Sequence, residues 1–276
     1  MNGHLPAGVH GASRLAISNR ETRGNSIVFD TRIILESQVG HLFEPAAHTA
    51  AGRTMANDYY GSASAADTLT ASWLADIRRQ VRPRRNLVPC PSKCALLVID
   101  MQRHFCSPEG RAYLPASAHI VPRVARLVSA FKGAGGRIVF TRHGHSGPED
   151  TGMLGRFWSD FLRSNELDAA IVSGTGITGS ETLLPKKTYD AFLNTPLEHL
   201  LHEWNCTQVL VTGVMANLCC ETTTRSAFCR GFEVFAVADA MAASNEELHY
   251  NSLLALASGF GNIYSTHEIE ELWKTP

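Results

Sequence analysis

The sequence predicts an α/β protein of three layers, in which helices cover both faces of a central, mostly parallel sheet. Short, continuous apolar runs are typical of strands buried on both faces, and they occur at 95–100, 137–141 and 208–212. Segments with helical spacing separate these runs, so that helix and strand alternate along the chain. The pattern indicates a Rossmann-like sheet whose functional groups gather at the carboxyl ends of the strands.

The N-terminal part differs in composition from the rest of the chain. Residues 1–54 are rich in Gly, Ala, Ser, His and Arg and show no sustained period, so we expect a disordered or non-native extension. Residues 55–92 should form an N-terminal helix, over about 65–80, and a linker. Three apolar residues share one face of that helix, namely Leu69, Trp73 and Ile77. The remaining residues, 93–276, are expected to form one domain without an internal repeat.

The later elements follow from apolar spacing and from the glycines and prolines between them. In order, they are a strand over 95–100, a helix over 120–131, a strand over 137–141, a helix over 197–204, a strand over 208–212, a helix over 219–230, a strand over 233–237 and a last helix over 245–258.

The composition excludes several classes of protein. A chain of 276 residues with 44% hydrophobic residues and a net charge of −1 can form one large core and has no extended basic surface for nucleic acid. We interpret the basic segment 78–85 as a solvated linker. No apolar stretch reaches the roughly 20 residues that span a bilayer, and no secretory signal is visible. We therefore expect a soluble, cytoplasmic protein without nucleic-acid or membrane partners.

The cysteines do not form a disulfide or zinc framework. There are seven, an odd number, and they are spread through apparent core segments. Cys90 and Cys94 have the spacing of a metal-binding pair, but no second Cys or His pair completes four ligands. A reducing compartment and a free thiol fit this pattern better.

One of these thiols is a candidate nucleophile. The apolar strand that ends at Thr212 leads through a tight turn, and Cys219 stands where the next helix begins. Free N–H groups at a helix start favour thiolate over thiol and can also hold an oxyanion. The alternative is that Cys219 is simply a small buried apolar residue.

Two charged residues bear on this choice. Asp100 closes the apolar strand 95–100, and Lys186 lies just beyond another short apolar run. Because the carboxyl ends of parallel strands meet at one edge of a sheet, a cysteine, a carboxylate and an ammonium can come together there.

In these segments the chain resembles the isochorismatase-like cysteine hydrolases, the superfamily of nicotinamidases, N-carbamoylsarcosine amidohydrolases and isochorismatases. The resemblance extends from about Cys94 to Ile263, and three motifs carry it: Leu97-Val-Ile-Asp-Met-Gln102, Lys186 followed by Tyr189-Asp-Ala-Phe192 and Thr195, and the turn from Gly213 to Thr223. It implies that Asp100 is the general acid and base, Lys186 the stabilising cation and Cys219 the nucleophile.

The resemblance also implies a cis peptide bond between Val214 and Met215, with an oxyanion hole formed by the N–H groups of Met215 and Cys219. Two neighbours compete for the motif positions. Counting from Gly213 places the nucleophile at Cys219 and not Cys220, which should pack in the helix. Counting back from Phe192 places the lysine at Lys186 and not Lys187, which should be solvated.

Residues near the strand ends and motif turns are candidates for contact with a small, partly apolar or aromatic substrate: Phe105, His143, Trp158, Tyr189, Phe192 and Asn217. Trp158 lies in a segment that can close over the pocket, or else belongs to the core. His143 and His145 are open to three interpretations, as metal ligands, substrate contacts or loop residues. Nicotinamidases bind a metal through an aspartate and histidines, but the segment 100–105 lacks Asp-x-His, so we expect no metal and no cofactor.

The resemblance favours cleavage of an amide or ureido C–N bond through a thioester. A vinyl ether hydrolase of the isochorismatase type is the alternative, although that branch has glycine where Cys219 stands and tyrosine where Met215 stands. A catalytically inert binding protein is the alternative of another class. Members of the superfamily commonly form dimers or tetramers, so we also expect a homo-oligomer.

Overall fold

The computed structural model describes residues 63–84 and 86–274, and the expectation for residues 1–54 lies outside this range. The helices and strands are α1 Ala63–Gln80, β1 Cys94–Ile99, α2 Arg103–Cys106, α3 Ser117–Gly133, β2 Arg137–His143, α4 Gly152–Trp158, β3 Thr182–Lys186, α5 Leu197–Glu203, β4 Gln208–Val214, α6 Glu221–Cys229, β5 Glu233–Ala242, α7 Glu246–Gly259, β6 Gly261–Tyr264 and α8 Thr266–Lys274. Three short 3₁₀ turns lie at Pro148–Asp150, Leu167–Ala169 and Ser173–Thr175, and a π-helical turn spans Ala216–Cys220.

The sheet has six strands in the order β3-β2-β1-β4-β5-β6, and every pairing between neighbours is parallel. The two central strands, β1 and β4, are buried at every residue, which explains their continuous apolar sequences. A proline has no N–H to donate to a neighbouring strand. The strand β3 tolerates Pro185 because it lies at the edge of the sheet, where one of its sides has no neighbour among the described strands. The predicted three-layer α/β/α fold is confirmed.

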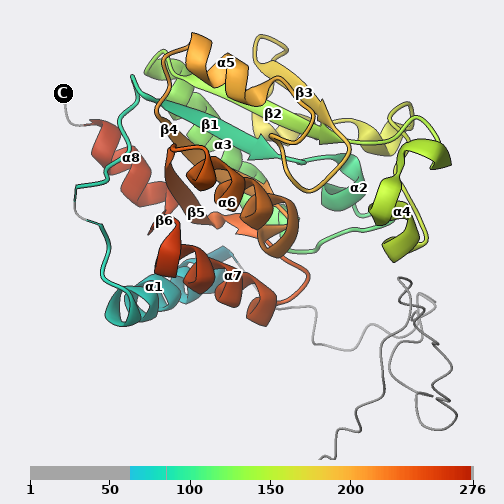
Figure 1. Cartoon of the computed structure of the whole chain (residues 1–276). Helices are drawn as coiled ribbons and strands as arrows, with labels where there is room; N and C mark the ends of the chain where they lie inside the picture. The colour runs from blue at the N-terminus through green and yellow to red at the C-terminus, as the bar shows by residue number, and fades with distance from the viewer. Residues whose placement is uncertain (1–62, 85, 275–276) are drawn as a thin grey trace, which may run out of the picture. The chain divides into compact units, whose positions relative to one another are not determined.

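Helices cover both faces of this sheet (Figure 1). On one face α3 packs against β5 and against α8, whereas α6 packs against β5 and α7 on the other. The core between the layers holds large, fully buried side chains, among them Phe131, Phe140 and Phe235. From the helix predicted over 65–80, Trp73 and Ile77 are buried in the same core.

The structure extends the sequence-based description at three places. The helix predicted over 245–258 is α7, but it is not the last, because β6 and α8 follow it. The helix predicted over 219–230 begins as a π-helical turn, and α6 proper starts only at Glu221. The helix α4, which carries Trp158, was not predicted as an element.

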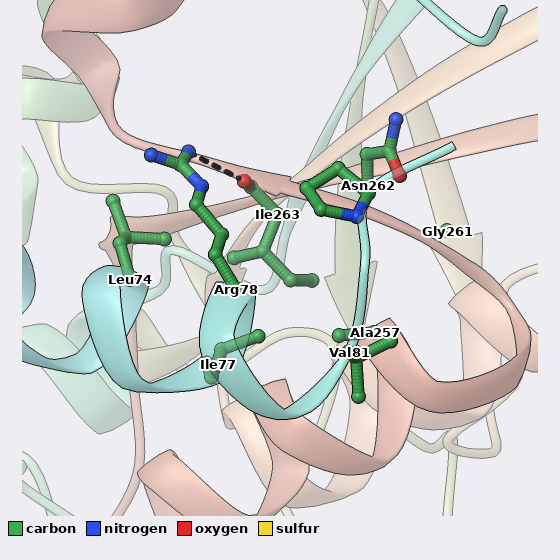
Figure 2. Close-up of a pocket in the computed structure, with 9 residues that line it drawn as sticks. Leu74, Ile77, Arg78, Val81, Ala257, Gly261, Asn262 and Ile263 are labelled. Carbon is green, nitrogen blue, oxygen red and sulfur yellow. Dashed lines mark hydrogen bonds between the residues drawn. The ribbon is translucent and has the colours of Figure 1, made fainter. Parts of the chain in front are cut away.

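The basic segment 78–85 begins within the last turn of α1 and is more than a solvated linker. Arg78 forms an ion pair with Glu268 of α8 at 2.8 Å and donates a hydrogen bond to the carbonyl of Ile263 in β6 at 3.2 Å. Figure 2 shows this bond beside a small hollow that α1, α7 and β6 line. No charged group other than Arg78 lines the hollow, whereas a buried pair of charged side chains lies at the carboxyl ends of the strands.

No helix in the described part of the chain is both long enough and apolar enough to cross a membrane.

Candidate active site

Three side chains from three neighbouring segments meet at the carboxyl edge of the sheet. Asp100 directly follows β1, Lys186 ends β3, and Cys219 lies in the π-helical turn after β4. The Lys186 Nζ atom is 2.7 Å from Asp100 Oδ2 and 3.4 Å from Cys219 Sγ. Asp100 is completely buried, and Lys186 and Cys219 are 2% and 7% exposed. The sequence motifs therefore converge on one small, closed site.

The Lys186 ammonium group is fully coordinated. Its third partner is the carbonyl of Thr188, at 2.8 Å from Nζ, and an ammonium has three N–H groups to donate. Burial alone would lower the pKa of Lys186, but the neighbouring Asp100 and Cys219 outweigh burial and raise it. Lys186 is therefore a fixed cation that has no N–H group left for a substrate.

The Cys219 thiol is protonated at rest. Burial raises its pKa to about 12, whereas the positive charge of Lys186 lowers it; the negative charge of Asp100, and then its hydrogen bond with the thiol, act in the same direction as burial. The sequence-based expectation that the helix start would favour the thiolate is thus wrong for the closed site. Proton transfer to Asp100 has to accompany any attack by the sulfur atom.

The turn that carries Cys219 depends on a glycine. Gly213 has φ +112°, and a Cβ atom at this position would collide with the backbone of Ile99 on the paired strand β1. The peptide bond between Val214 and Met215 is cis. The next cysteine, Cys220, is completely buried, and burial raises its pKa well above the ordinary value. The geometry therefore presents Cys219, and not Cys220, to Lys186.

Two buried polar residues to which the sequence analysis gave no role support this edge of the sheet: Thr141 holds Asp100, and Gln102 holds the backbone of His143. Thr141, in β2, donates a hydrogen bond from Oγ1 to Asp100 Oδ1 at 2.6 Å and accepts one from the Asp100 N–H at 3.0 Å. Gln102 is completely buried and exchanges hydrogen bonds with both the N–H and the carbonyl of His143, each at 2.8 Å. The only sequence signal for either is a polar residue at the end of an apolar run.

The candidate substrate contacts occupy different environments. Trp158 is 54% exposed, and its indole N–H donates to the Tyr189 hydroxyl at 2.7 Å, so Trp158 is not a core residue. Tyr189 and Phe105 are partly buried against the core. Asn217 lies two residues before Cys219, and its Oδ1 atom is buried without a hydrogen-bond partner.

Phe192 lies in the core, and its assignment as a substrate contact stays a prediction. This residue is 4% exposed, its ring packs against Phe232 at 6.0 Å between centroids, and the Arg230 guanidinium lies over it at 5.0 Å. Phe192 is therefore part of the core below the site. Lys187 is on the surface, as predicted, where its ammonium pairs with Asp150.

The two histidines after β2 lie side by side. The rings of His143 and His145 are 5.0 Å apart, and His145 Nδ1 is 3.4 Å from Asp150 Oδ1. Burial, together with the nearby Lys186 charge, lowers the pKa of His143 to about 4, so its ring is neutral near pH 7. Within residues 63–84 and 86–274, no three His, Cys, Asp or Glu side chains are arranged to hold a metal ion. The donor set in this part of the chain therefore does not fit a metal.

The chain is similar to proteins of a known family. The isochorismatase domain model matches residues 94–268. Nicotinamidase 3 of Arabidopsis thaliana is 41% identical over 169 residues, which cover 60% of this chain and 81% of that protein. The chain belongs to the isochorismatase family. Its homologues in this family are hydrolases with the same fold, and this protein is a hydrolase.

Two further similar proteins carry different names. Enterobactin synthase component B of Escherichia coli K12 is 31% identical over 180 residues, covering 65% of this chain and 63% of that protein. A crystal structure of a cysteine hydrolase from Pseudomonas syringae pv. phaseolicola 1448A superposes with a TM-score of 0.66 at 27% identity, covering 68% of this chain and 95% of that one. The family assignment therefore leaves open which bond the protein hydrolyses.

Proposed function

We propose that this isochorismatase-family hydrolase cleaves an amide or ureido C–N bond of a small molecule through Asp100, Lys186 and Cys219. One observation supports this more than any other. A buried thiol lies beside a buried carboxylate and ammonium pair, with Lys186 Nζ 3.4 Å from the sulfur. Burying a charged pair is costly, and a fold rarely retains one next to a cysteine without a chemical use for it.

The reaction begins when Asp100 takes the thiol proton while Cys219 Sγ bonds to the substrate carbonyl carbon. The carbonyl oxygen becomes an oxyanion, which we assign to the N–H groups of Met215 and Cys219. Each such donor contributes roughly 3 kcal/mol in comparable hydrolases. Asp100 then returns the proton to the departing nitrogen, the C–N bond breaks, and a thioester remains on Cys219.

Water completes the cycle. Asp100 accepts a proton from the water molecule as its oxygen attacks the thioester carbon, and the C–S bond breaks. The acid leaves, and the proton on Asp100 returns to the Cys219 sulfur. Lys186 stays charged throughout, because its raised pKa keeps it protonated near neutral pH, and it stabilises the negative charge that moves between oxygen and sulfur.

The substrate is proposed to be small and planar. The thiol is only 7% exposed, and the side chains assigned around it offer flat surfaces and a few polar atoms. These are Phe105, His143, Trp158, Tyr189 and Asn217. Because the relative with 41% identity is named a nicotinamidase, nicotinamide is the first compound to test.

The test is release of ammonia from a panel of nicotinamide, other small carboxamides and ureido compounds. Changing Cys219→Ala should lower kcat by at least about 10³-fold, as removal of a nucleophile does in other hydrolases. Cys220→Ala is the matched control, because Cys220 is the adjacent buried cysteine, and it should retain most activity. An acyl adduct on the wild type, seen by intact mass after quenching, would support the thioester, whereas equal activity of the two variants would exclude it.

Vinyl ether hydrolysis is the second candidate, because the bacterial relatives include an isochorismatase of Bacillus subtilis, which is 28% identical over 167 residues. In that chemistry Asp100 would protonate the substrate and no nucleophile would be needed. Turnover of isochorismate by both the wild type and Cys219→Ala would establish it. If neither the amide and ureido panel nor isochorismate is turned over, and iodoacetamide does not label Cys219, a binding protein is favoured.

We also propose a homo-oligomer, dimer or tetramer, which light scattering would reveal.

A further inference from the structure

One buried hydroxyl makes both of the hydrogen bonds that fix Asp100 to β2. Thr141 is completely buried, and its Oγ1 atom donates to Asp100 Oδ1 at 2.6 Å while accepting from the Asp100 N–H at 3.0 Å. A threonine hydroxyl has one proton to donate and two lone pairs, so it can make both bonds at once. A valine of the same shape could make neither.

The backbone of Asp100 needs this support. Its φ of +49° lies in the left-handed region, which is unfavourable for a non-glycine residue. The chain leaves β1 at this residue, so its N–H group cannot continue the ladder of the sheet, and a buried N–H without a partner is unfavourable. Thr141 satisfies that N–H and so stabilises the turn in which the carboxylate stands.

The two carboxylate oxygens of Asp100 have separate partners. Oδ1 accepts from Thr141, and Oδ2 lies 2.7 Å from Lys186 Nζ, which also reaches Cys219 Sγ at 3.4 Å. Without the bond to Oδ1, the carboxyl group would be free to rotate about its χ2 angle.

We infer that Thr141 is a positioning residue, which holds the Asp100 carboxylate turned so that Oδ2 is the oxygen available to Lys186 and to the Cys219 thiol. The inference rests on the proposed function, because it assigns Thr141 to the general base of that reaction. It goes beyond that function by adding a fourth side chain, from β2, that acts through Asp100 and not on the substrate. Five titratable groups interact with Asp100 in this site, namely Lys186 of β3, His143 of β2, Cys106 of α2, and Cys219 and Cys220 of the π-helical turn.

The experiment compares Thr141→Val, Thr141→Ser and Thr212→Val. Serine keeps the hydroxyl and loses a methyl group, whereas valine keeps the shape and loses the hydroxyl. Thr212 is the matched control, because it is also completely buried and its hydroxyl bonds to the carbonyl of Ala240. For each protein, kcat and KM for the best substrate of the panel are measured against pH, after circular dichroism has shown that it is folded.

For Thr141→Val we expect the acid limb of the kcat/KM profile to move to higher pH by about one unit or more, the size of one charge-assisted hydrogen bond. At the plateau, kcat should fall about tenfold while KM changes little, since Thr141 does not touch the substrate. Thr141→Ser should restore the wild-type acid limb. Thr212→Val should lower the melting temperature without moving the limb.

A second measurement keeps the inference separate from the proposed function. The rate at which iodoacetamide alkylates Cys219, followed by peptide mass, depends on proton acceptance by Asp100 and needs no substrate. The pH profile of this rate should be displaced from that of the wild type in Thr141→Val and not in Thr141→Ser. If the wild type hydrolyses no substrate, the proposed function fails while alkylation still tests Thr141. If Thr141→Val does not fold, the pair Thr141→Ser and Thr141→Ala replaces it. Matching profiles for the hydroxyl-bearing and hydroxyl-free variants would overturn the inference.

Discussion

Lys186 is the residue on which the charge balance of the site depends. Its three N–H groups are taken by Asp100, Cys219 and Thr188, and both it and Asp100 are almost completely excluded from water. The attraction within such a pair repays desolvation only while both partners are present. Lys186 is thus expected to matter for folding as well as for turnover.

We predict that Lys186→Met abolishes activity and lowers the free energy of unfolding by about 3–5 kcal/mol, because it leaves the Asp100 charge buried without a partner. The neighbouring Lys187→Met is the control. The Lys187 side chain is 55% exposed in its pair with Asp150, so its loss should cost less than about 1 kcal/mol. Urea unfolding of both variants measures the difference, and equal losses would contradict the assignment. Asp100→Asn added to Lys186→Met should recover part of the lost stability.

At the scale of elements, α4 is a helix of the described chain that leaves large apolar side chains exposed. None of its residues is buried, and Met153, Phe157 and Trp158 are all more than half exposed. It begins at Gly152 and is capped by Ser159, both of which have positive φ, at +56° and +54°. A helix with so little buried surface is held mainly by local contacts, and the bond from Trp158 to Tyr189 joins it to the rim of the site.

We predict that Trp158→Phe raises KM about fivefold for a small aromatic substrate, with a smaller effect on kcat. The ring is retained but the indole N–H is lost, and one neutral hydrogen bond contributes about 1 kcal/mol. Because α4 carries no buried residue, the melting temperature should stay within about 2 °C. Steady-state kinetics beside Phe157→Leu, which removes a 72% exposed ring from the same helix, provides the comparison. An equal KM in both variants would show that the Trp158 bond has no part in binding.

The same element shows where sequence reasoning ends. Strands β1 and β4 were predictable because burial on both faces requires an uninterrupted apolar run. Helix α4 has no buried face, so no periodicity marks it, and the four residues of β6 are too few to show a pattern. In the site, the motifs predicted the positions of Asp100 and Cys219. Thr141 could not be predicted, because its role depends on the pairing of β1 with β2, which no local pattern contains.

At the scale of the whole molecule, buried neutral histidines make stability depend on pH. Burial lowers the pKa of His249, on α7, to about 3, and that of His143 to about 4. A group whose pKa is lower in the folded than in the unfolded state binds its proton more tightly after unfolding. Its contribution to stability is therefore complete above the unfolded value of about 6.5 and is lost as the pH falls toward the folded value.

The range from pH 6.5 to 4.5 isolates this effect, because unfolded carboxyl groups titrate mainly below it. Each histidine should lose about 2–3 kcal/mol of stabilisation over these two pH units, since one pKa unit corresponds to 1.36 kcal/mol. We therefore predict that the unfolding free energy of His249→Gln falls by about 2–3 kcal/mol less than that of the wild type between pH 6.5 and 4.5. Urea unfolding at each pH measures this difference. The control is His199→Gln on α5, where the side chain is 74% exposed, and its curve should follow the wild type.

His249 lies edge-on to Trp73 of α1, with 5.0 Å between ring centroids, so protonation within this contact should loosen α1 from the sheet first. Hydrogen exchange in α1 that rises at pH 4.5 in the wild type, and not in His249→Gln, would locate the acid sensitivity there, whereas parallel stability curves for all three proteins would refute it.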